Sequence, residues 1–419
     1  MKIAFKIEYL FQFIAFILNP FLGLLSSLYY MFKKDRFVNA FTASLSISLI
    51  FIYLPIMYDC SSRFYLYFYQ QKSSFLEINL YNKIIIFLHQ LFHIEYMSVI
   101  YLYTTFIFYI WFFIFKYYKK YADSNKIILL MMIYFISSIL YRNIMDLERF
   151  YLAVSILLLT IFIVEYKIIK MKALTILTIF FTSTLIHTGA FLLLPIFFIS
   201  KINLNIKLLA ILPILALVFS TNSYYYLSLL LDTPVFTLID GQTMHLMKAY
   251  IDPNSIWGSK NMRYSLVFLR YIELPLMFLI YYKGLILLKN KDSLAIRMVL
   301  LLMILAIVFL PYVTLYERFS TTFFIFSIFI IYPVILKKKQ DLLLYIILIL
   351  FIIRFLFINY HIYGMIFTEK YNNVLPNENK KIEMILKPFY YPSVLLLWID
   401  TNGYSDSYIR RESRRGKVY

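Results

Sequence analysis

The sequence predicts an all-α, polytopic integral membrane protein, and its composition and apolar runs lead to that fold class. Of the 419 residues, 62% are hydrophobic and only 15% are charged, whereas a soluble domain has about 45–50% apolar and about 25% charged residues. The chain holds 42 Phe and 40 Tyr but one Cys, and its net charge is +19. So much apolar surface cannot be buried in one soluble globule. A disordered chain, a disulfide scaffold and a soluble nucleic-acid-binding protein are therefore excluded.

Several apolar runs are long enough to cross a bilayer as one helix, which takes about 20 residues. The first run lacks the small-residue cleavage site of a signal peptide, so we expect no cleavable signal. These candidate spans are residues 9–31, 37–58, 96–115, 264–288, 294–316, 319–336 and 342–360.

The middle of the chain has shorter apolar runs. Residues 127–141 and 150–164 flank a polar stretch and are each too short to cross alone. Another run, 208–220, leads into three consecutive tyrosines. We expect 127–164 to form a pair of short helices.

Residues 173–199 are apolar for longer than one span needs, and His187 interrupts them near the centre. We expect two short helices, 173–186 and 189–200, with His187 at the turn between them. One long tilted helix is the alternative.

Lysines and arginines in the loops predict the orientation, because cytoplasmic loops carry an excess of these residues. Cytoplasmic and outer loops alternate along the whole chain only if 173–199 crosses the membrane twice. This gives about 12 transmembrane helices, some short and paired, with both termini outside. The loops assigned to the cytoplasm are 33–36, 116–126, 167–172, 201–207, 289–291 and 337–339.

We divide the chain into a polytopic transmembrane domain, 1–360, and a polar C-terminal tail, 361–419. Two long outer loops, 59–95 and 221–263, belong to the first. The loop 221–263 carries Asp240, His245 and Trp257 among Tyr and Asn residues. Aromatic rings beside carboxylates and amides are typical of sugar-binding sites, so we expect sugar contacts here. A packed cap with an interfacial aromatic belt is the alternative.

The loop 59–95 contains His89 and His93, four positions apart on one helical face. Such a pair has the spacing of two zinc ligands, but a third ligand is not apparent. We therefore favour an interfacial helix and expect no metal site.

Charged residues and one histidine gather at the ends of the outer helices. Such residues are costly at membrane depth and usually face a cavity or a partner. The short outer loops hold mostly Arg, which grips phosphate or carboxylate with two parallel hydrogen bonds. The groups are Asp59 with Arg63, Arg142 with Glu148 and Arg149, His187, and Glu317 with Arg318.

Each of these residues also has a purely structural interpretation. Arg142 and Arg149 have Asp146 and Glu148 beside them as ion-pair partners, and a lone histidine in an apolar run is often a satisfied core residue.

Two further arginines lie within apolar runs, Arg270 and Arg354. We expect Arg270 to pair with Glu273, which is three positions away on one helical face. Arg354 is expected to extend to the membrane surface.

Four short motifs follow one another between about residues 50 and 340. Their order resembles the Wzy/EpsG-type polysaccharide polymerases of bacterial O-antigen and capsule gene clusters. Two departures are Tyr58-Asp59-Cys60, where that family often has Gly-Thr-Asp, and the Thr-Gly that follows His187. The motifs are Asp59-Cys60-Ser61-Ser62-Arg63-Phe64-Tyr65, Arg149-Phe150-Tyr151-Leu152-Ala153, Ile186-His187-Thr188-Gly189-Ala190-Phe191 and Tyr316-Glu317-Arg318-Phe319.

The resemblance implies a GT-C-like helical glycosyltransferase. It would polymerise undecaprenyl-pyrophosphate-linked oligosaccharide repeat units into O-antigen or capsular polysaccharide at the periplasmic face of the bacterial inner membrane. The implied partners are that substrate, membrane lipid, and the chain-length regulator and flippase of the same pathway, with no nucleic acid. We expect no cofactor, and the chain has no P-loop, GxGxxG or HExxH motif.

Such an enzyme must hold a diphosphate leaving group and position an acceptor hydroxyl. We expect Arg149 to be the most function-sensitive arginine and Arg318 the second. A lipid-linked oligosaccharide flippase and a membrane O-acyltransferase are the alternative functions, although we find neither two repeated halves nor an early Arg and His. The expected diphosphate ligands are Arg149, Arg142, Arg318 and Arg63, and the expected catalytic residues are His187, Asp59 and Glu317.

Overall fold

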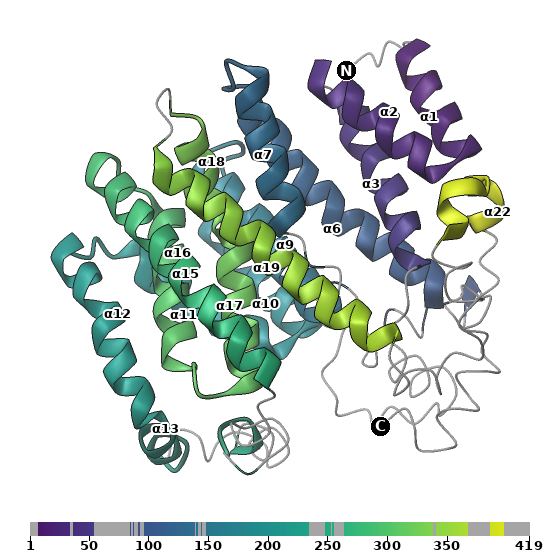
Figure 1. The fold of residues 1–419 in the computed structure, drawn as a ribbon. Helices are drawn as coiled ribbons and strands as arrows, with labels where there is room; N and C mark the ends of the chain where they lie inside the picture. The colour runs from purple at the N-terminus through teal and green to yellow at the C-terminus, as the bar shows by residue number, and fades with distance from the viewer. Residues whose placement is uncertain are drawn as a thin grey trace, which may run out of the picture.

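The computed structural model describes residues 7–33, 37–53, 84, 87, 91–92, 96–138, 140, 144, 148–233, 248–252, 254, 264–337, 341–367 and 386–397. Within these ranges every regular element is a helix, which confirms the all-α fold class (Figure 1). The helices are α1 (Ile7–Leu18), α2 (Pro20–Lys33), α3 (Phe37–Ile52), α6 (Tyr96–Lys119), α7 (Asn125–Ser138), α9 (Glu148–Glu165), α10 (Ala173–Ile186), the 3-10 helix η1 (Thr188–Leu192), α11 (Leu193–Lys201), α12 (Ile206–Thr221), α13 (Ser223–Leu231), α15 (Tyr264–Asn290), α16 (Leu294–Val308), α17 (Val313–Phe326), α18 (Ile328–Ile335), α19 (Leu342–Phe367) and α22 (Ser393–Leu397).

Four helical stretches in the described part of the chain are long and apolar enough to cross a membrane. A further pair, α12 and α13, passes the same criterion together but bends by 83°. Several shorter apolar helices accompany them, so the chain is a helical, multi-pass membrane protein. The count of about 12 spans and the GT-C-like arrangement stay predictions. The four stretches are Ser98–Lys119, Val267–Asn290, Val313–Ile335 and Leu342–Asn359.

Polar side chains lie between the first three helices, and apolar side chains lie on their outer faces. Gln12 on α1 donates to Asn39 Oδ1 at 2.9 Å and accepts from Thr42 Oγ1 at 3.1 Å, both on α3. Ser27 on α2 reaches the same Thr42 hydroxyl at 2.7 Å. Ile7 and its apolar neighbours are exposed instead. Hydrogen bonds between helices behind an apolar exterior are typical of helices packed in lipid.

The run 9–31 is not one span, and that prediction is wrong. α1 and α2 form a hairpin, because the rings of Phe11 and Tyr30 lie 6.3 Å apart, whereas a straight helix would separate these positions by about 28 Å. Asn19 Oδ1 caps α2 by accepting from the Phe21 N–H at 2.8 Å, and Pro20 takes the first helical position. Helix α1 therefore starts at the end of the molecule where α2 finishes, and the prediction that both termini lie outside stays a prediction.

The chain also reverses at His187, as predicted. α10 ends at Ile186 and α11 begins at Leu193. The rings of Phe180 and Phe197 lie 5.0 Å apart, although a straight helix would place them about 25 Å apart. The prediction of two short helices is confirmed, while their crossing of the membrane stays a prediction.

Helix ends that border some of the loops assigned to the cytoplasm contact one another in the described part of the chain. The Arg297 guanidinium donates to the Ser200 carbonyl at 2.6 Å. Lys283 on α15 donates to Asp341, and this hydrogen bond holds the pKa of the Asp341 carboxyl below its ordinary value. The grouping of these loops on one side therefore agrees with the packing.

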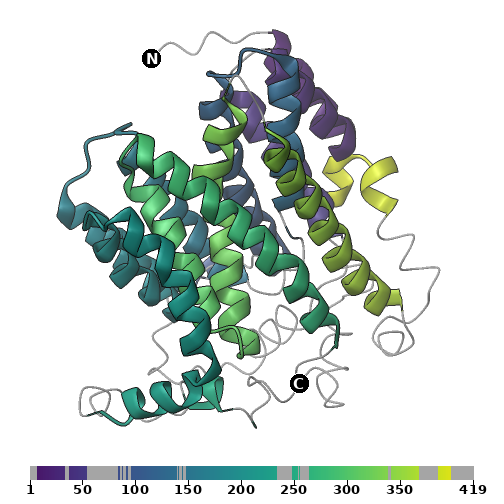
Figure 2. The ribbon, with the colours of Figure 1, turned by 60° about the vertical axis from the view of Figure 1, so that its left-hand side comes forward.

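Residues 386–397 pack against the first helices, far from them in sequence (Figure 2). Asn19 Nδ2 donates to the carbonyls of Pro388 and Tyr391, each at 3.0 Å. The Tyr53 hydroxyl donates to the Leu396 carbonyl at 2.7 Å. Helix α19 continues to Phe367, and the predicted division at residue 360 stays a prediction.

Candidate functional site

Helix α17 places two neighbouring charged residues, Glu317 and Arg318, in different surroundings. The sequence predicted them in a loop between spans 294–316 and 319–336. This prediction is wrong, because α16 already ends at Val308 and α17 begins at Val313. Consecutive residues of a helix point about 100° apart, so Glu317 and Arg318 point in different directions from one turn of α17.

Arg318 contacts His187 across the bundle. Arg318 Nη1 lies 2.7 Å from His187 Nε2. His187 ends α10 and starts η1 in extended backbone, with φ −150° and ψ 118°. Its Nδ1 accepts from the Gly189 N–H at 2.9 Å. The turn predicted from the sequence therefore presents the imidazole to an arginine from α17.

Arg318 supplies hydrogen-bond donors on this side of α17. A guanidinium only donates, and which imidazole nitrogen of His187 accepts depends on the tautomer. Arg318 Nε is buried and has no hydrogen-bond partner among the described residues. An anionic oxygen beside Arg318 would accept from this N–H.

Phe150 fixes the orientation of both side chains. Its buried ring lies 5.2 Å from the His187 ring, at 72°, and 5.3 Å from the Arg318 guanidinium carbon. Arg149, half-buried in the first turn of α9, precedes it. The positive end of a helix adds to the attraction for an anion. Three of the four predicted motifs therefore meet here.

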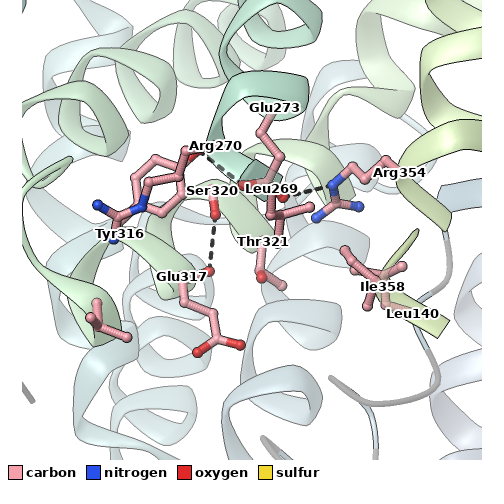
Figure 3. Close-up of a pocket in the computed structure, with 11 residues that line it drawn as sticks. Leu140, Leu269, Arg270, Glu273, Tyr316, Glu317, Ser320, Thr321, Arg354 and Ile358 are labelled. Atoms are coloured by element: carbon pink, nitrogen blue, oxygen red, sulfur yellow. Dashed lines mark hydrogen bonds and ion pairs between the residues drawn. The ribbon is translucent and has the colours of Figure 1, made fainter. Parts of the chain in front are cut away.

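A pocket opens on the other side of α17 (Figure 3). It is an open pocket, lined by residues of α15, α17 and α19 together with Leu140. Figure 3 places Arg354 on one side, Arg270 and Tyr316 on the other, and Glu317 apart from both arginines. The lining residues are Leu140, Leu269, Arg270, Glu273, Val313, Tyr316, Glu317, Ser320, Thr321, Arg354 and Ile358.

A buried ion pair forms one wall of this pocket. Arg354 Nε lies 2.7 Å from Glu273 Oε1, and the exposed fractions of the two side chains are 2% and 2%. The Tyr316 hydroxyl donates to Glu273 Oε2 at 2.9 Å, and the Arg354 guanidinium stacks 4.0 Å from the Phe324 ring. Arg354 therefore does not extend to the membrane surface, and that prediction is wrong.

Arg270 does not pair with Glu273, contrary to the prediction. Its Nη1 donates to the Leu310 carbonyl and its Nη2 to the Tyr312 carbonyl, the latter at 3.1 Å. Its guanidinium stacks 4.6 Å from the Tyr316 ring. Arg270 thus ties α15 to the turn between α16 and α17.

Most residues of this pocket are not among the site residues predicted from the sequence. Ser320 and Thr321 follow Glu317 by three and four positions, which is the spacing of one helical face. That spacing would have indicated a polar stripe on α17 if the start of the helix had been placed correctly.

Several predicted residues lie outside the described part of the chain and stay predictions. The side chain of Glu148 is also outside it, so the pairing of the outer arginines with acidic neighbours is untested. Among the described residues, no group of three or more His, Cys, Asp and Glu side chains is arranged to hold a metal ion. The undescribed residues are Asp59, Arg63, Arg142, Asp146, Asp240, His245 and Trp257, together with His89 and His93 of the expected interfacial helix.

Comparison with known families agrees with the motifs that meet at this site. The family model "EpsG family" matches residues 62–376. The chain belongs to the EpsG family. That match confirms the resemblance seen in the sequence and suggests a polysaccharide polymerase of the glycosyltransferase type. The EpsG-matched range contains Arg149, His187, Arg318 and every pocket residue. No curated protein and no solved structure is significantly similar to the chain.

Proposed function

We propose that this EpsG-family protein polymerises undecaprenyl-pyrophosphate-linked oligosaccharide repeat units into O-antigen or capsular polysaccharide. The observation that supports the proposal is the Arg318 guanidinium, which lies beside Phe150 and His187 and has a buried Nε–H without a partner among the described residues. A diphosphate offers anionic oxygens that such a guanidinium would bind. The proposal places the site at the periplasmic face of the inner membrane, with the chain-length regulator and flippase of the pathway as partners.

The reaction is an exchange of one bond at the anomeric carbon of the donor sugar. An acceptor hydroxyl oxygen bonds to that carbon, and the bond from the carbon to the diphosphate oxygen breaks. Polyprenyl diphosphate leaves with the bonding electrons, and the hydroxyl proton passes to a base on the protein. Fixed donors near the leaving oxygens stabilise the charge that develops there.

The arginines supply this stabilisation without a cofactor in our proposal. Guanidinium groups bind phosphate in a planar, two-pronged geometry and stay charged. In this proposal the diphosphate ligands are Arg149, Arg142, Arg318 and Arg63, the acceptor is positioned by His187, Asp59 or Glu317, and sugar contacts come from Asp240, His245 and Trp257.

A strain lacking the gene tests the function. We expect lipid-linked single repeat units, or one repeat on the final acceptor, and loss of the long-chain ladder on a polysaccharide gel. Repeat units accumulating on the cytoplasmic side would indicate a flippase. Normal chain length with a missing substituent would indicate an acyltransferase, and an unaltered ladder would end the polymerase proposal.

Gly189 offers a test of the His187 geometry. A Cβ at Gly189 would lie 2.9 Å from both Cε1 and Nδ1 of His187, so Gly189→Ala must displace the imidazole. We expect chain growth to fall roughly tenfold to a hundredfold, because a displacement of about 1 Å in a catalytic site has this effect. Ladder formation per unit of membrane-inserted protein measures it.

Gly284→Ala is the matched control for this variant. A Cβ at Gly284 would approach the side-chain tips of Ile330 and Leu300 at 2.8 Å each, on a part of α15 remote from His187. We expect Gly284→Ala to keep its activity per folded molecule. Equal losses in both variants would show that crowding, and not the imidazole position, reduces activity.

A further inference from the structure

We propose that the pocket on the Glu317 side of α17 binds the acceptor sugar and that Glu317 takes the proton from its attacking hydroxyl. This proposal rests on the proposed function and adds a second subsite to it. The donor diphosphate would lie on the Arg318 side of the same helical turn.

The two sides of α17 differ in charge and therefore suit different ligands. The pocket contains two arginines and two glutamates. Arg354 is paired with Glu273, and two N–H groups of Arg270 donate to backbone carbonyls. The pocket therefore suits an uncharged ligand, whereas the other side carries the cationic Arg318, whose buried Nε–H has no partner among the described residues. A burial cost for unpaired charge would oppose a diphosphate beside Glu317 and Glu273.

The polar groups of the pocket match the hydroxyls of a sugar. Arg354 Nη1 is buried and has no hydrogen-bond partner among the described residues, although its guanidinium lines the pocket. Ser320 and Thr321 also line the pocket, and Glu317 places a carboxylate at another edge. Small-ligand sites combine a few placed polar groups with apolar walls. The apolar walls, which suit the C–H face of a sugar ring, are Leu140, Leu269, Val313 and Ile358.

The ion pair and Tyr316 position the pocket donors. The Arg354 guanidinium is held by Glu273 at 2.7 Å and stacks on Phe324 at 4.0 Å. The Tyr316 hydroxyl donates to the second carboxylate oxygen of Glu273 at 2.9 Å. Both interactions leave Arg354 little freedom, so Nη1 keeps its direction when a ligand enters. We regard Glu273 and Tyr316 as positioning residues.

The spacing of the two subsites follows from α17 itself. The Cα atoms of adjacent residues are about 3.8 Å apart, so Glu317 and Arg318 lie on one turn with their side chains in different directions. A displacement brings the acceptor oxygen to about 3–3.5 Å from the anomeric carbon, so in our proposal the two ligands meet at the edge of this turn.

Transfer kinetics in proteoliposomes test this assignment. The donor is the lipid-linked repeat unit, and the acceptor probe is the lipid-free repeat-unit oligosaccharide released from it by mild acid. We expect Thr321→Val to raise the acceptor KM about tenfold, the value of one lost hydrogen bond, with the donor KM unchanged. Glu317→Gln should lower kcat. Thr322→Val is the matched control, because the neighbouring Thr322 hydroxyl donates to the Arg318 carbonyl within α17 and does not line the pocket.

Each outcome separates the subsite from the function. An active wild type whose acceptor KM is unmoved by Thr321→Val, or whose donor KM rises instead, overturns the subsite and leaves the polymerase proposal standing. If the wild type transfers nothing, the polymerase proposal fails. Binding of the lipid-free oligosaccharide to the solubilised protein then decides whether the pocket binds a sugar. Binding that Thr321→Val weakens about tenfold supports the pocket, and absence of binding overturns it.

Discussion

Replacing Arg318 with alanine is expected to abolish chain-length growth while the protein stays folded in the membrane. Arg318 Nη1 reaches His187 Nε2 at 2.7 Å, and the guanidinium lies over Phe150. Arg318 is only half-buried, so its replacement should disturb the fold little. Removing one preorganised donor from a site of this kind typically lowers kcat about 10²–10³-fold. The ladder and an immunoblot of the membrane fraction measure the two effects.

Arg318→Lys decides whether charge alone is sufficient. An ammonium is a point charge without the planar fork of a guanidinium. It cannot stack on Phe150 and donate in two directions at the same time, so we expect poor rescue. Arg149→Ala and Arg149→Lys, tested in parallel, check the prediction from sequence that Arg149 is the more sensitive of the two. A full ladder in Arg318→Ala would remove the diphosphate role from this arginine.

The His187–Arg318 side of the site could be predicted from the sequence because local signals mark it. A histidine followed by Thr-Gly interrupts an apolar run that is too long for one span, and this indicates a turn. The sequence assigned Arg149 and Arg318 to the outer side against the usual charge bias, and such an assignment indicates a ligand. The structure brings His187, Arg318 and Phe150 together from three separate elements.

The pocket could not be predicted in the same way, because packing between distant helices decides it. Spacing along α15 favours an Arg270–Glu273 pair, yet Glu273 faces Arg354 on α19 and Arg270 faces the α16–α17 turn. The rotation of each helix about its axis sets these partners. In a membrane protein apolar residues cover all sides of a helix, so hydrophobic periodicity gives little information about that rotation.

The α1–α2 hairpin was not predicted from the sequence for a different reason. The residues Asn19-Pro20 carry the signals of a helix cap and a first helical turn, but the continuous apolar run around them favours one span. Local capping and the polar contacts of Gln12 with α3 outweigh the continuity of the run. Breaks marked by Asn-Pro within apolar runs therefore predict hairpins better than run length does.

Arg354→Leu is expected to destabilise the folded protein by about 3–5 kcal/mol, the usual cost of removing one partner of a buried ion pair. The Glu273 carboxylate, 1% exposed, would keep only the Tyr316 hydroxyl as a partner among the interactions described above. Glu273→Leu should have a similar effect, since it leaves the Arg354 guanidinium buried without its carboxylate. Thermal unfolding of the detergent-solubilised protein measures both changes. Lys248→Ala is the control, because it breaks an ion pair with Asp232 whose side chains are 54% and 63% exposed, and such pairs contribute at most about 1 kcal/mol.

The double variant Glu273→Leu/Arg354→Leu separates stability from function. Replacing both members of a buried pair with apolar residues is often neutral or stabilising, so we expect the unfolding temperature to return close to that of the wild type. Chain growth should nevertheless stay lost, because Arg354 Nη1 no longer faces the pocket and Tyr316 has no carboxylate to hold. A double variant as unstable as the single variants would show that packing, and not charge, sets the cost of each substitution. Recovery of both stability and chain growth would show that the pair is purely structural, and the pocket would then need another donor for its ligand.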